Sequence, residues 1–209
     1  MAHKDSHYKL TYFNLRGIAE PVRQLFAYAN VPYEDVRLDR ENWANSSQKQ
    51  ESPFHQLPFL EVDGHTIGQS NAILRFVGKR LNLAGKDEFE QARVDALADY
   101  ATDMRSPLSA WFFEQDETRK KAMKEKYFNE TLPGFLKTYE QHLKSNGGQF
   151  FVGSGPTWAD FVIAHGMGQL QVVEPNALNG YELLKAHEQR INNLQGVKEW
   201  ISKRPKTPM

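Results

Sequence analysis

The sequence predicts an α/β domain followed by an all-helical (all-α) domain, with a four-stranded mixed sheet in the first. Three observations indicate this class. Strand and helix patterns alternate over residues 8–83, Asp63-Gly64 separates two short strand-like runs, and residues 89–209 carry almost no strand signal. The chain has 209 residues, 40% of them hydrophobic, which suits one large domain or two small ones. We expect domains at 1–83 and 89–209, joined by a linker at 84–88.

The first strand is expected at YKLTYF, residues 8–13, and a helix follows almost at once. Pro21 would sit in the first turn of this helix, where its missing N–H costs little. The apolar positions recur at helical spacing, at Ile18, Val22, Leu25, Phe26 and Ala29. A second strand is predicted at VPYEDVRL, residues 31–38. The helix between the two strands favours a parallel pair.

A polar stretch, DRENWANSSQKQES, comes next and is expected to be a loop with one short helical turn. PFLEV at 58–62 and HTI at 65–67 flank Asp63-Gly64, so they should form an antiparallel hairpin. Gln69-Ser70 then opens a helix, with Ser70 as its N-cap. The simplest closure of this order is a four-stranded mixed sheet covered by helices. That is the thioredoxin-like arrangement, here without a CxxC pair.

The second part of the chain is predicted to be a helical bundle. Asn146-Gly147-Gly148 are typical helix-stop residues, and Thr157 with Asp160 nearly forms a capping box before an apolar run. Five helices are expected, over residues 89–104, 132–143, 161–164, 183–194 and 197–201.

Composition excludes several function classes. Lys+Arg and Asp+Glu each number 26, and no dense basic run occurs, so no nucleic-acid partner is expected. No apolar run approaches the ~20 residues of a membrane helix, and the first residues lack the apolar region of a signal peptide. With no cysteine and seven scattered histidines, we expect neither disulfides nor a metal site. The cytosol is the expected compartment.

Two candidate sites lie at strand ends. Tyr12 ends a strand beside a helix start, which is the usual ligand crevice of open α/β sheets, and its phenol can donate one hydrogen bond. The alternative is an aromatic packed at a domain seam. In Gln56-Leu57-Pro58 a proline enters a strand, where it removes a ladder donor. A cis bond there would turn the Leu57 backbone outward, although most X–Pro bonds are trans.

Two further candidates follow along the chain. Gln69-Ser70 opens a helix, so free N–H groups, a hydroxyl and the helix dipole could bind a carboxylate. The alternative is an ordinary N-cap. Trp43 lies in the polar stretch, where a large aromatic either marks a binding surface or anchors the loop on the core. Lys49 could supply a cation to such a surface.

Taken in order, these pieces resemble a cytosolic glutathione transferase, most closely the sigma class in its invertebrate form. The resemblance rests on TYFNLRGIAEPVR, PFHQLPFLEVDG, IGQSNAILRFV and TWADF at matching intervals, and it spans nearly the whole chain. It implies a cytoplasmic detoxifying homodimer that transfers the glutathione thiolate to small hydrophobic electrophiles. Glutathione would be the co-substrate, and no metal would be needed.

The resemblance also implies roles for single residues. Tyr12 matches the catalytic tyrosine that hydrogen-bonds the glutathione sulfur. The other expected glutathione-binding residues are Trp43, Lys49, Gln56, Leu57, cis Pro58, Gln69, Ser70 and, from the second subunit, Asp103, with Asp99 as a neighbouring alternative. Lys49 matches when counted back from Pro53-Phe54, whereas counting forward from Trp43 reaches Ser47. Thr157 and Asp160 match a cap involved in folding.

An electrophile pocket is expected between the two halves. Its implied walls are Phe13, Met104, Leu108, Trp111 and the C-terminal Met209, although Leu108 and Trp111 could instead pack helices together. Ile18 stands where the family often has an arginine, so the positive charge that would favour the thiolate is not expected at this position. Competing functions are a prostaglandin D synthase-like isomerase, a binding protein for haem or hydrophobic ligands, and a crystallin-like structural relative.

Overall fold

The computed structural model describes residues 6–207. The chain forms two compact units, Met1–Ala84 with Asn192–Met209, and Gly85–Ile191. We call the first the sheet unit and the second the helical unit. Of the described residues, 192–207 cluster with the sheet unit, although we predicted them as part of the helical domain. The predicted linker at 84–88 stays a prediction.

The sheet unit contains the predicted mixed sheet, with strand order β2-β1-β3-β4. β1 pairs in parallel with β2 and antiparallel with β3, and β3 pairs antiparallel with β4. The four strands are β1 (Tyr8–Phe13), β2 (Glu34–Leu38), β3 (Phe59–Val62) and β4 (His65–Gly68). Both the parallel pair and the hairpin expected from the sequence are therefore confirmed.

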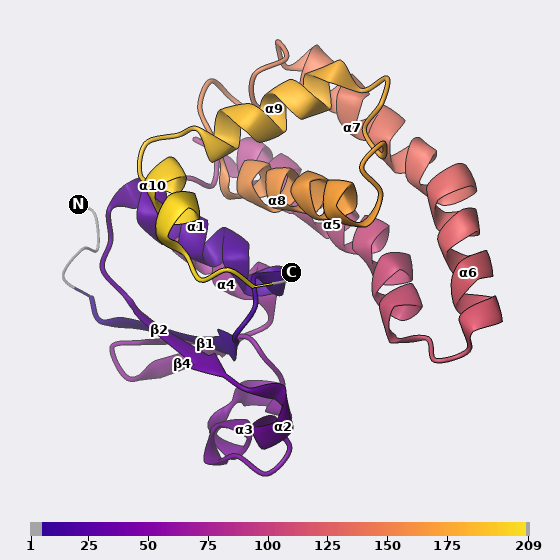
Figure 1. The fold of residues 1–209 in the computed structure, drawn as a ribbon. Helices are drawn as coiled ribbons and strands as arrows, with labels where there is room; N and C mark the ends of the chain where they lie inside the picture. Colours follow the sequence, from indigo (N-terminus) through magenta and orange to yellow (C-terminus); the bar gives the residue numbers. More distant parts are fainter. Residues whose placement is uncertain (1–5, 208–209) are drawn as a thin grey trace. The chain divides into compact units, whose positions relative to one another are not determined.

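Helices cover one face of this sheet (Figure 1). They are η1 (Gly17–Ala19), α1 (Glu20–Ala29), α4 (Ser70–Arg80) and, from the chain's end, α10 (Val197–Lys203), which packs on α1. The apolar stripe of α1 is buried, and Phe26 packs on Tyr8 of β1 with ring centroids 5.0 Å apart. The N-cap of α4 is Gln69, not Ser70 as predicted, because Ser70 already belongs to the helix.

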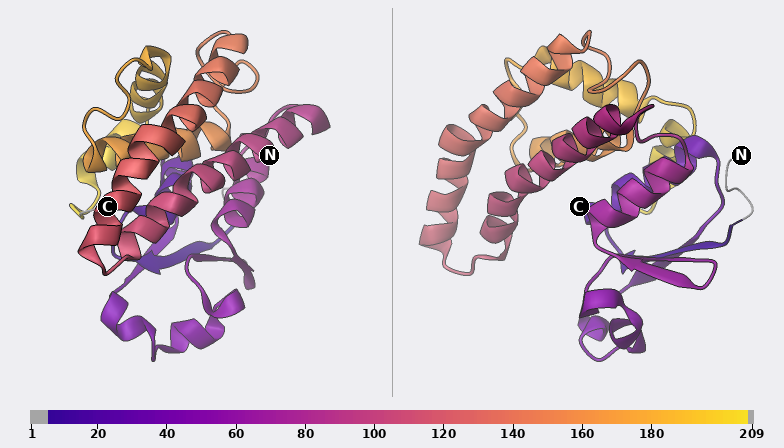
Figure 2. Two further views of the ribbon diagram at one scale, coloured as in Figure 1. Left: turned by 90° about the vertical axis from the view of Figure 1, so that its right-hand side faces the viewer. Right: turned by 180° about the vertical axis from the view of Figure 1, so that it is seen from behind.

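The polar stretch after β2 contains two short helices, more than the single turn predicted. These are α2 (Arg40–Trp43) and α3 (Ser47–Glu51), followed by the turn η2 (Pro53–His55). Ser46 caps α3, because its hydroxyl accepts a hydrogen bond from the Lys49 N–H at 3.2 Å. Figure 2 shows the two helices as a small lobe projecting beyond the sheet.

The helical unit is built around α8, which packs against α5. Trp158, Phe161 and Ile163 of α8 are fully buried, as expected for a helix at the centre of a bundle. The helices are α5 (Glu88–Phe113), α6 (Glu117–Lys126), the π-helical turn η3 (Tyr127–Thr131), α7 (Leu132–Ser145), α8 (Trp158–Val173) and α9 (Glu182–Asn192).

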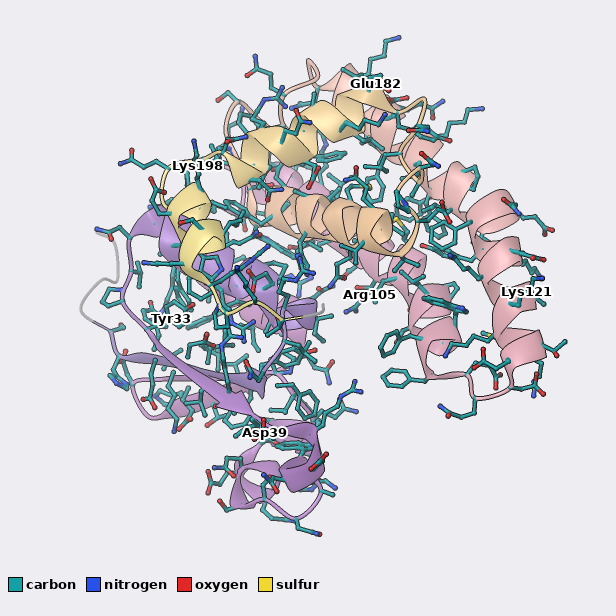
Figure 3. All side chains as sticks on the ribbon, in the orientation of Figure 1. Tyr33, Asp39, Arg105, Lys121, Glu182 and Lys198 are labelled. Carbon is teal, nitrogen blue, oxygen red and sulfur yellow. The ribbon has the colours of Figure 1, made fainter. Side chains whose placement is uncertain are left out.

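Two features of this unit differ from the prediction. α5 continues through Pro107 to Phe113, beyond the expected end near residue 104. α6 was not predicted at all, because it is polar along its length and buries no residue. It lies alongside α5, and Lys121 points outward from it (Figure 3). Asp116 caps α6, accepting a hydrogen bond from the Arg119 N–H at 2.9 Å.

The predicted capping box at the start of α8 is confirmed. Oδ2 of Asp160 accepts hydrogen bonds from both the N–H and the hydroxyl of Thr157, each at 2.8 Å. Oδ1 accepts a third from the Phe151 N–H at 3.0 Å and lies 2.9 Å from Nε2 of His187. Asp160 and His187 are fully buried, so this cap also joins α8 to α9 inside the core.

Candidate functional site

Tyr12 lies next to the end of β1, an inner strand, with only 8% of its surface exposed. The strand register places two other predicted residues beside it. The last printed pairs are Thr11 with Phe59 and Phe59 with Gly68, so the next positions across the sheet are Tyr12, Pro58 and Gln69. Neighbouring strands are ~4.8 Å apart, which puts these three backbones in one row at a single edge of the sheet.

The backbone is unusual at two points of this row. The Leu57–Pro58 peptide bond is cis, as the resemblance implied and as the residues alone did not. Gln69 has φ of 69°, in the region that non-glycine residues rarely occupy. Rare backbone angles of the Gln69 kind concentrate at functional sites, since the surrounding structure must hold them there.

The side chains of two predicted residues meet directly at this edge. Nε2 of Gln69 donates a hydrogen bond to Oε1 of Gln56 at 3.0 Å, and both residues are exposed. Ser70 follows as the first residue of α4 and is half-buried. The first N–H groups of a helix and its dipole favour an anion, so this end of α4 suits a carboxylate.

A second group of predicted residues connects to Tyr12 through an aromatic chain. The ring of Phe13 lies 5.7 Å from that of Tyr12 and 6.1 Å from that of Trp43, which it meets edge-on. The guanidinium of Arg40 lies over Phe13, 5.6 Å from the ring centre. Trp43 thus anchors α2 to the end of β1. Lys49 lies in α3, half-buried, with its N–H on the Ser46 hydroxyl.

The loop after β1 contains a residue whose role the sequence analysis missed. Gly17 has φ of 45°, and a Cβ added there would lie 2.6 Å from the Tyr12 hydroxyl oxygen. It would also lie 2.5 Å from a methyl group of Leu15. A side chain at this position would therefore displace the phenol. The signal was present in the sequence, as a glycine directly between strand and helix.

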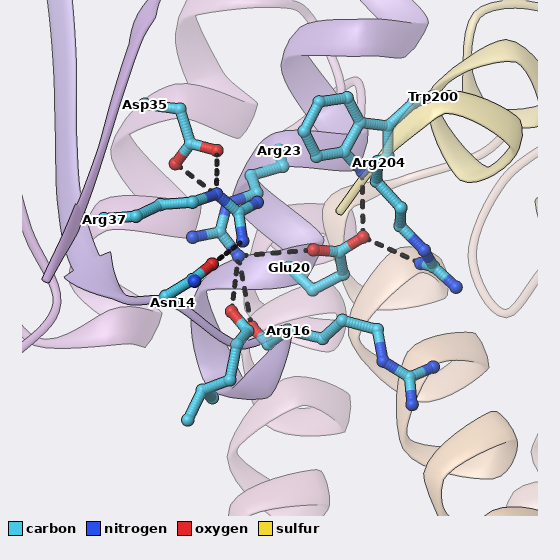
Figure 4. Close-up of polar contacts among 9 residues, drawn as sticks. Asn14, Arg16, Glu20, Arg23, Asp35, Arg37, Trp200 and Arg204 are labelled. Carbon is cyan, nitrogen blue, oxygen red and sulfur yellow. Dashed lines mark hydrogen bonds and ion pairs between the residues drawn. The ribbon is translucent and has the colours of Figure 1, made fainter. Parts of the chain in front are cut away.

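A buried ion network behind this loop was also missed (Figure 4). Arg23 and Glu20 of α1 are both fully buried, and Arg23 bonds Asp35 of β2 through Nε at 3.0 Å. Burial lowers the pKa of the neighbouring Arg16 guanidinium, as does the charge of Arg204, while Glu20 opposes this. The only local sequence signal was a Glu–Arg pair at i,i+3 within an otherwise apolar stripe.

The remaining predicted residues belong to the helical unit. Asp103 and Asp99 are exposed on α5. Met104 is buried, with its methyl group 3.6 Å from the position of a Cβ at Gly166 of α8. Leu108 and Trp111 are half-buried near the end of α5, and the predicted pocket residue Met209 falls outside the described residues. The electrophile pocket stays a prediction.

Within residues 6–207, no group of three or more His, Asp or Glu side chains could hold a metal ion. No helix in the same range is long and apolar enough to cross a membrane.

Comparisons with known proteins agree with one another. The chain matches the family "Glutathione S-transferase, N-terminal domain" over residues 8–79 and the family "Glutathione S-transferase, C-terminal domain" over residues 102–204. It is 39% identical to Glutathione S-transferase 1 of Ascaris suum, covering 96% of this chain and 98% of that protein.

Solved structures similar to this chain cover nearly its whole length. Prostaglandin synthase D of Nilaparvata lugens is 39% identical, with a TM-score of 0.89 over 96% of this chain and 100% of that one. A Nu-class transferase from Haemonchus contortus is 37% identical, with a TM-score of 0.89 over 98% and 100%.

Proposed function

Because the chain belongs to the glutathione S-transferase family, we propose that its sheet unit binds glutathione with the sulfur beside Tyr12. The protein is a glutathione transferase, which joins the glutathione thiolate to hydrophobic electrophiles. The observation that supports the site most strongly is the row of Tyr12, Pro58 and Gln69 at one edge of the sheet. A tripeptide laid along this edge would meet a phenol, backbone groups and a helix N-terminus in turn.

Tyr12 acts on the protonation of the thiol. A free cysteine thiol has a pKa of ~8.5, so little thiolate exists at neutral pH. The phenol O–H donates a hydrogen bond to the charged sulfur, which favours the thiolate and lowers the thiol pKa. The released proton passes to solvent. The sulfur lone pair then forms the C–S bond. In a substitution the leaving group departs with its bonding electron pair; in an addition the π electrons of the attacked double bond move within the electrophile, which then takes a proton from solvent.

The rest of glutathione is held by charge and amides. Gln69 and Ser70, at the N-terminus of α4, bind the γ-glutamyl carboxylate. The backbone of Leu57, between Gln56 and cis Pro58, pairs with the cysteinyl part of glutathione. Trp43 and Lys49 hold the glycyl carboxylate, and Asp103 of a second copy meets the γ-glutamyl amine. Holding both reactants in position makes the encounter effectively intramolecular.

The electrophile is proposed to contact apolar side chains. These are Phe13, Met104, Leu108, Trp111 and Met209, and such a lining suits small hydrophobic substrates. Ile18 carries no charge, so the thiol pKa is expected to fall less than it would beside an arginine.

We further propose that the protein belongs to the sigma class, forms a homodimer and works in the cytoplasm. An exposed Phe54, 69% accessible, is consistent with a surface covered by a second copy.

Tyr12→Phe tests the sulfur role. A hydrogen bond to a charged group contributes ~1.5–3 kcal/mol, so kcat/KM with a chromogenic aryl halide should fall about 10- to 150-fold. Glutathione affinity, measured by calorimetry, should change little. Tyr181→Phe is the matched control, because its hydroxyl bonds Pro133 in the helical unit. Unchanged turnover in Tyr12→Phe would defeat the assignment.

A second candidate activity is glutathione-dependent prostaglandin D synthesis. The likeness to the Nilaparvata lugens protein favours it, since that protein is described as a prostaglandin synthase D. The test is conversion of a prostaglandin endoperoxide in the presence of glutathione. Product formation no faster than the uncatalysed rate rules this activity out, whereas the transferase activity is measured separately.

A further inference from the structure

We propose that the last helix of the chain positions the catalytic tyrosine through a buried ion network, with Trp200 and Arg204 as positioning residues. This inference rests on the proposal that Tyr12 acts on the glutathione sulfur. Every group involved lies in the sheet unit, and Figure 4 shows the contacts.

The network begins at the far end of the sequence. Oε1 of Glu20 accepts two hydrogen bonds at 2.8 Å, one from the indole N–H of Trp200 and one from Nη1 of Arg204. Oε2 of the same carboxylate lies 3.3 Å from Nη1 of Arg23. Glu20 and Arg23 are fully buried. A buried carboxylate needs such partners, because an unpaired charge in the interior is strongly unfavourable.

Arg23 carries the contact to the catalytic loop. Its Nη1 donates to the carbonyl oxygens of Leu15, at 3.0 Å, and Arg16, at 3.3 Å. Its Nε is fixed on Asp35 of β2 at 3.0 Å. The guanidinium is therefore held from two sides, and it holds two consecutive peptide groups of the loop that follows β1.

These peptide groups lie directly before Gly17, which forms the wall against the Tyr12 hydroxyl. Because a Cβ at Gly17 would come within 2.6 Å of that oxygen, the loop backbone limits where the phenol can lie. A shift of the Leu15 and Arg16 carbonyls moves this wall. Misplacement of a reacting group by about 1 Å can cost ~100-fold in rate.

The last helix also packs closely against α1, independently of its hydrogen bonds to Glu20. A Cβ at Gly196, just before α10, would collide with the carbonyl oxygen of Ala27 in α1. The indole of Trp200 lies 6.5 Å from the ring of Tyr33. Loss of the Trp200 or Arg204 hydrogen bond therefore leaves the buried Glu20–Arg23 pair to rearrange while α10 stays in place.

The test uses Trp200→Phe and Arg204→Gln in the full-length protein. Each removes one hydrogen bond to Glu20, and Trp200→Phe keeps an aromatic ring against Tyr33. We expect the pKa of bound glutathione, read from thiolate absorbance and from the pH profile of kcat/KM, to rise by about 0.5–1 unit. This corresponds to ~3- to 10-fold less thiolate below the pKa. The KM for glutathione should stay within about twofold of the wild-type value.

Two controls separate positioning from general stability. Ser202→Ala alters an exposed hydroxyl of the same helix, which bonds Glu199, and should leave the pH profile unchanged. Arg204→Lys keeps the positive charge, so the thiol pKa should rise less in this variant than in Arg204→Gln. Should Trp200→Phe fail to fold, the two Arg204 variants can still test the network, since Arg204 lies at its more accessible end with 18% of its side chain exposed.

A double-mutant cycle with Tyr12→Phe decides between the explanations. If the network acts through the phenol, Trp200→Phe lowers kcat/KM in the wild-type background and has no effect once the phenol is gone. Equal losses in both backgrounds, or an unmoved pH profile in both Trp200→Phe and Arg204→Gln, would overturn the inference. A silent Tyr12→Phe single variant would instead overturn the proposed role of Tyr12.

Discussion

Asp160 is the acceptor for three hydrogen bonds in the helical unit, and Asp160→Ala removes all of them at once. The N–H groups of Thr157 and Phe151 and the Thr157 hydroxyl donate to its carboxylate at 2.8–3.0 Å. His187 lies beside the same carboxylate with its Nε2 at 2.9 Å. Asp116 provides a matched comparison, because it caps α6 from an exposed position with a single bond to the Arg119 N–H.

The two caps should differ several-fold in their contribution to stability. A buried donor left without a partner costs ~1–3 kcal/mol, and Asp160→Ala leaves two backbone N–H groups and the His187 ring in that state. Neighbouring groups relax together, so these costs do not simply add. We expect a loss of about 4 kcal/mol in unfolding free energy. Asp116→Ala should lose only ~1 kcal/mol, the typical value for an exposed N-cap.

Urea unfolding followed by far-ultraviolet circular dichroism measures both losses at one fixed protein concentration. The midpoint of Asp160→Ala should fall well below that of Asp116→Ala, with similar denaturant slopes. Comparable losses for the two variants would refute the reasoning, because burial and partner number would then have no influence on the cap.

Three further predictions concern the sheet edge and a buried phenol. Gly17→Ala should lower kcat/KM about 10- to 100-fold by displacing the Tyr12 phenol, whereas Gly64→Ala, at φ of 84° with open space around it, should leave kcat/KM unchanged; equal losses would contradict this. Gln69→Gly should relieve ~1 kcal/mol of backbone strain in a thermal melt yet weaken glutathione binding at least about tenfold by calorimetry, and unaltered affinity would argue against its role. Burial raises the pKa of Tyr139 well above its usual value of ~10, so its contribution to stability is complete below pH ~10 and declines above it. Above pH ~10 the unfolding free energy should therefore fall by ~1.4 kcal/mol per pH unit less in Tyr139→Phe than in the wild type, and equal alkaline slopes in the two proteins would contradict this.

The sheet was predictable because its signals are local. Asp63-Gly64 lies between two short apolar runs, and a helical stripe separates the first two strands, which together specify the pairing. α6 gave no such signal, since a helix that buries nothing carries no apolar period. The helix predicted over residues 89–104 was too short, because α5 continues through Pro107, which lies at an exposed position.

The site was predictable only in part. Tyr12 and Gln69-Ser70 were proposed as candidates from their positions at element ends, whereas cis Pro58 followed only from the family resemblance. The positive φ of Gln69 could not be inferred, because glutamine has no preference for that region. No local sequence pattern could predict the partners of Glu20, since Trp200 lies 180 positions away in the chain.

Because residues 192–207 cluster with residues 6–84 in the sheet unit, this unit can complete its packing only late in synthesis. Residues 6–84 leave the ribosome long before Trp200 and Arg204, and domains generally begin to fold as they emerge. Until the final residues arrive, the Glu20 carboxylate lacks two of its donors, and the nascent sheet cannot bury it at full stability. A chain that lacks its last ten residues or so would therefore have a destabilised sheet unit, although most of that unit is made first.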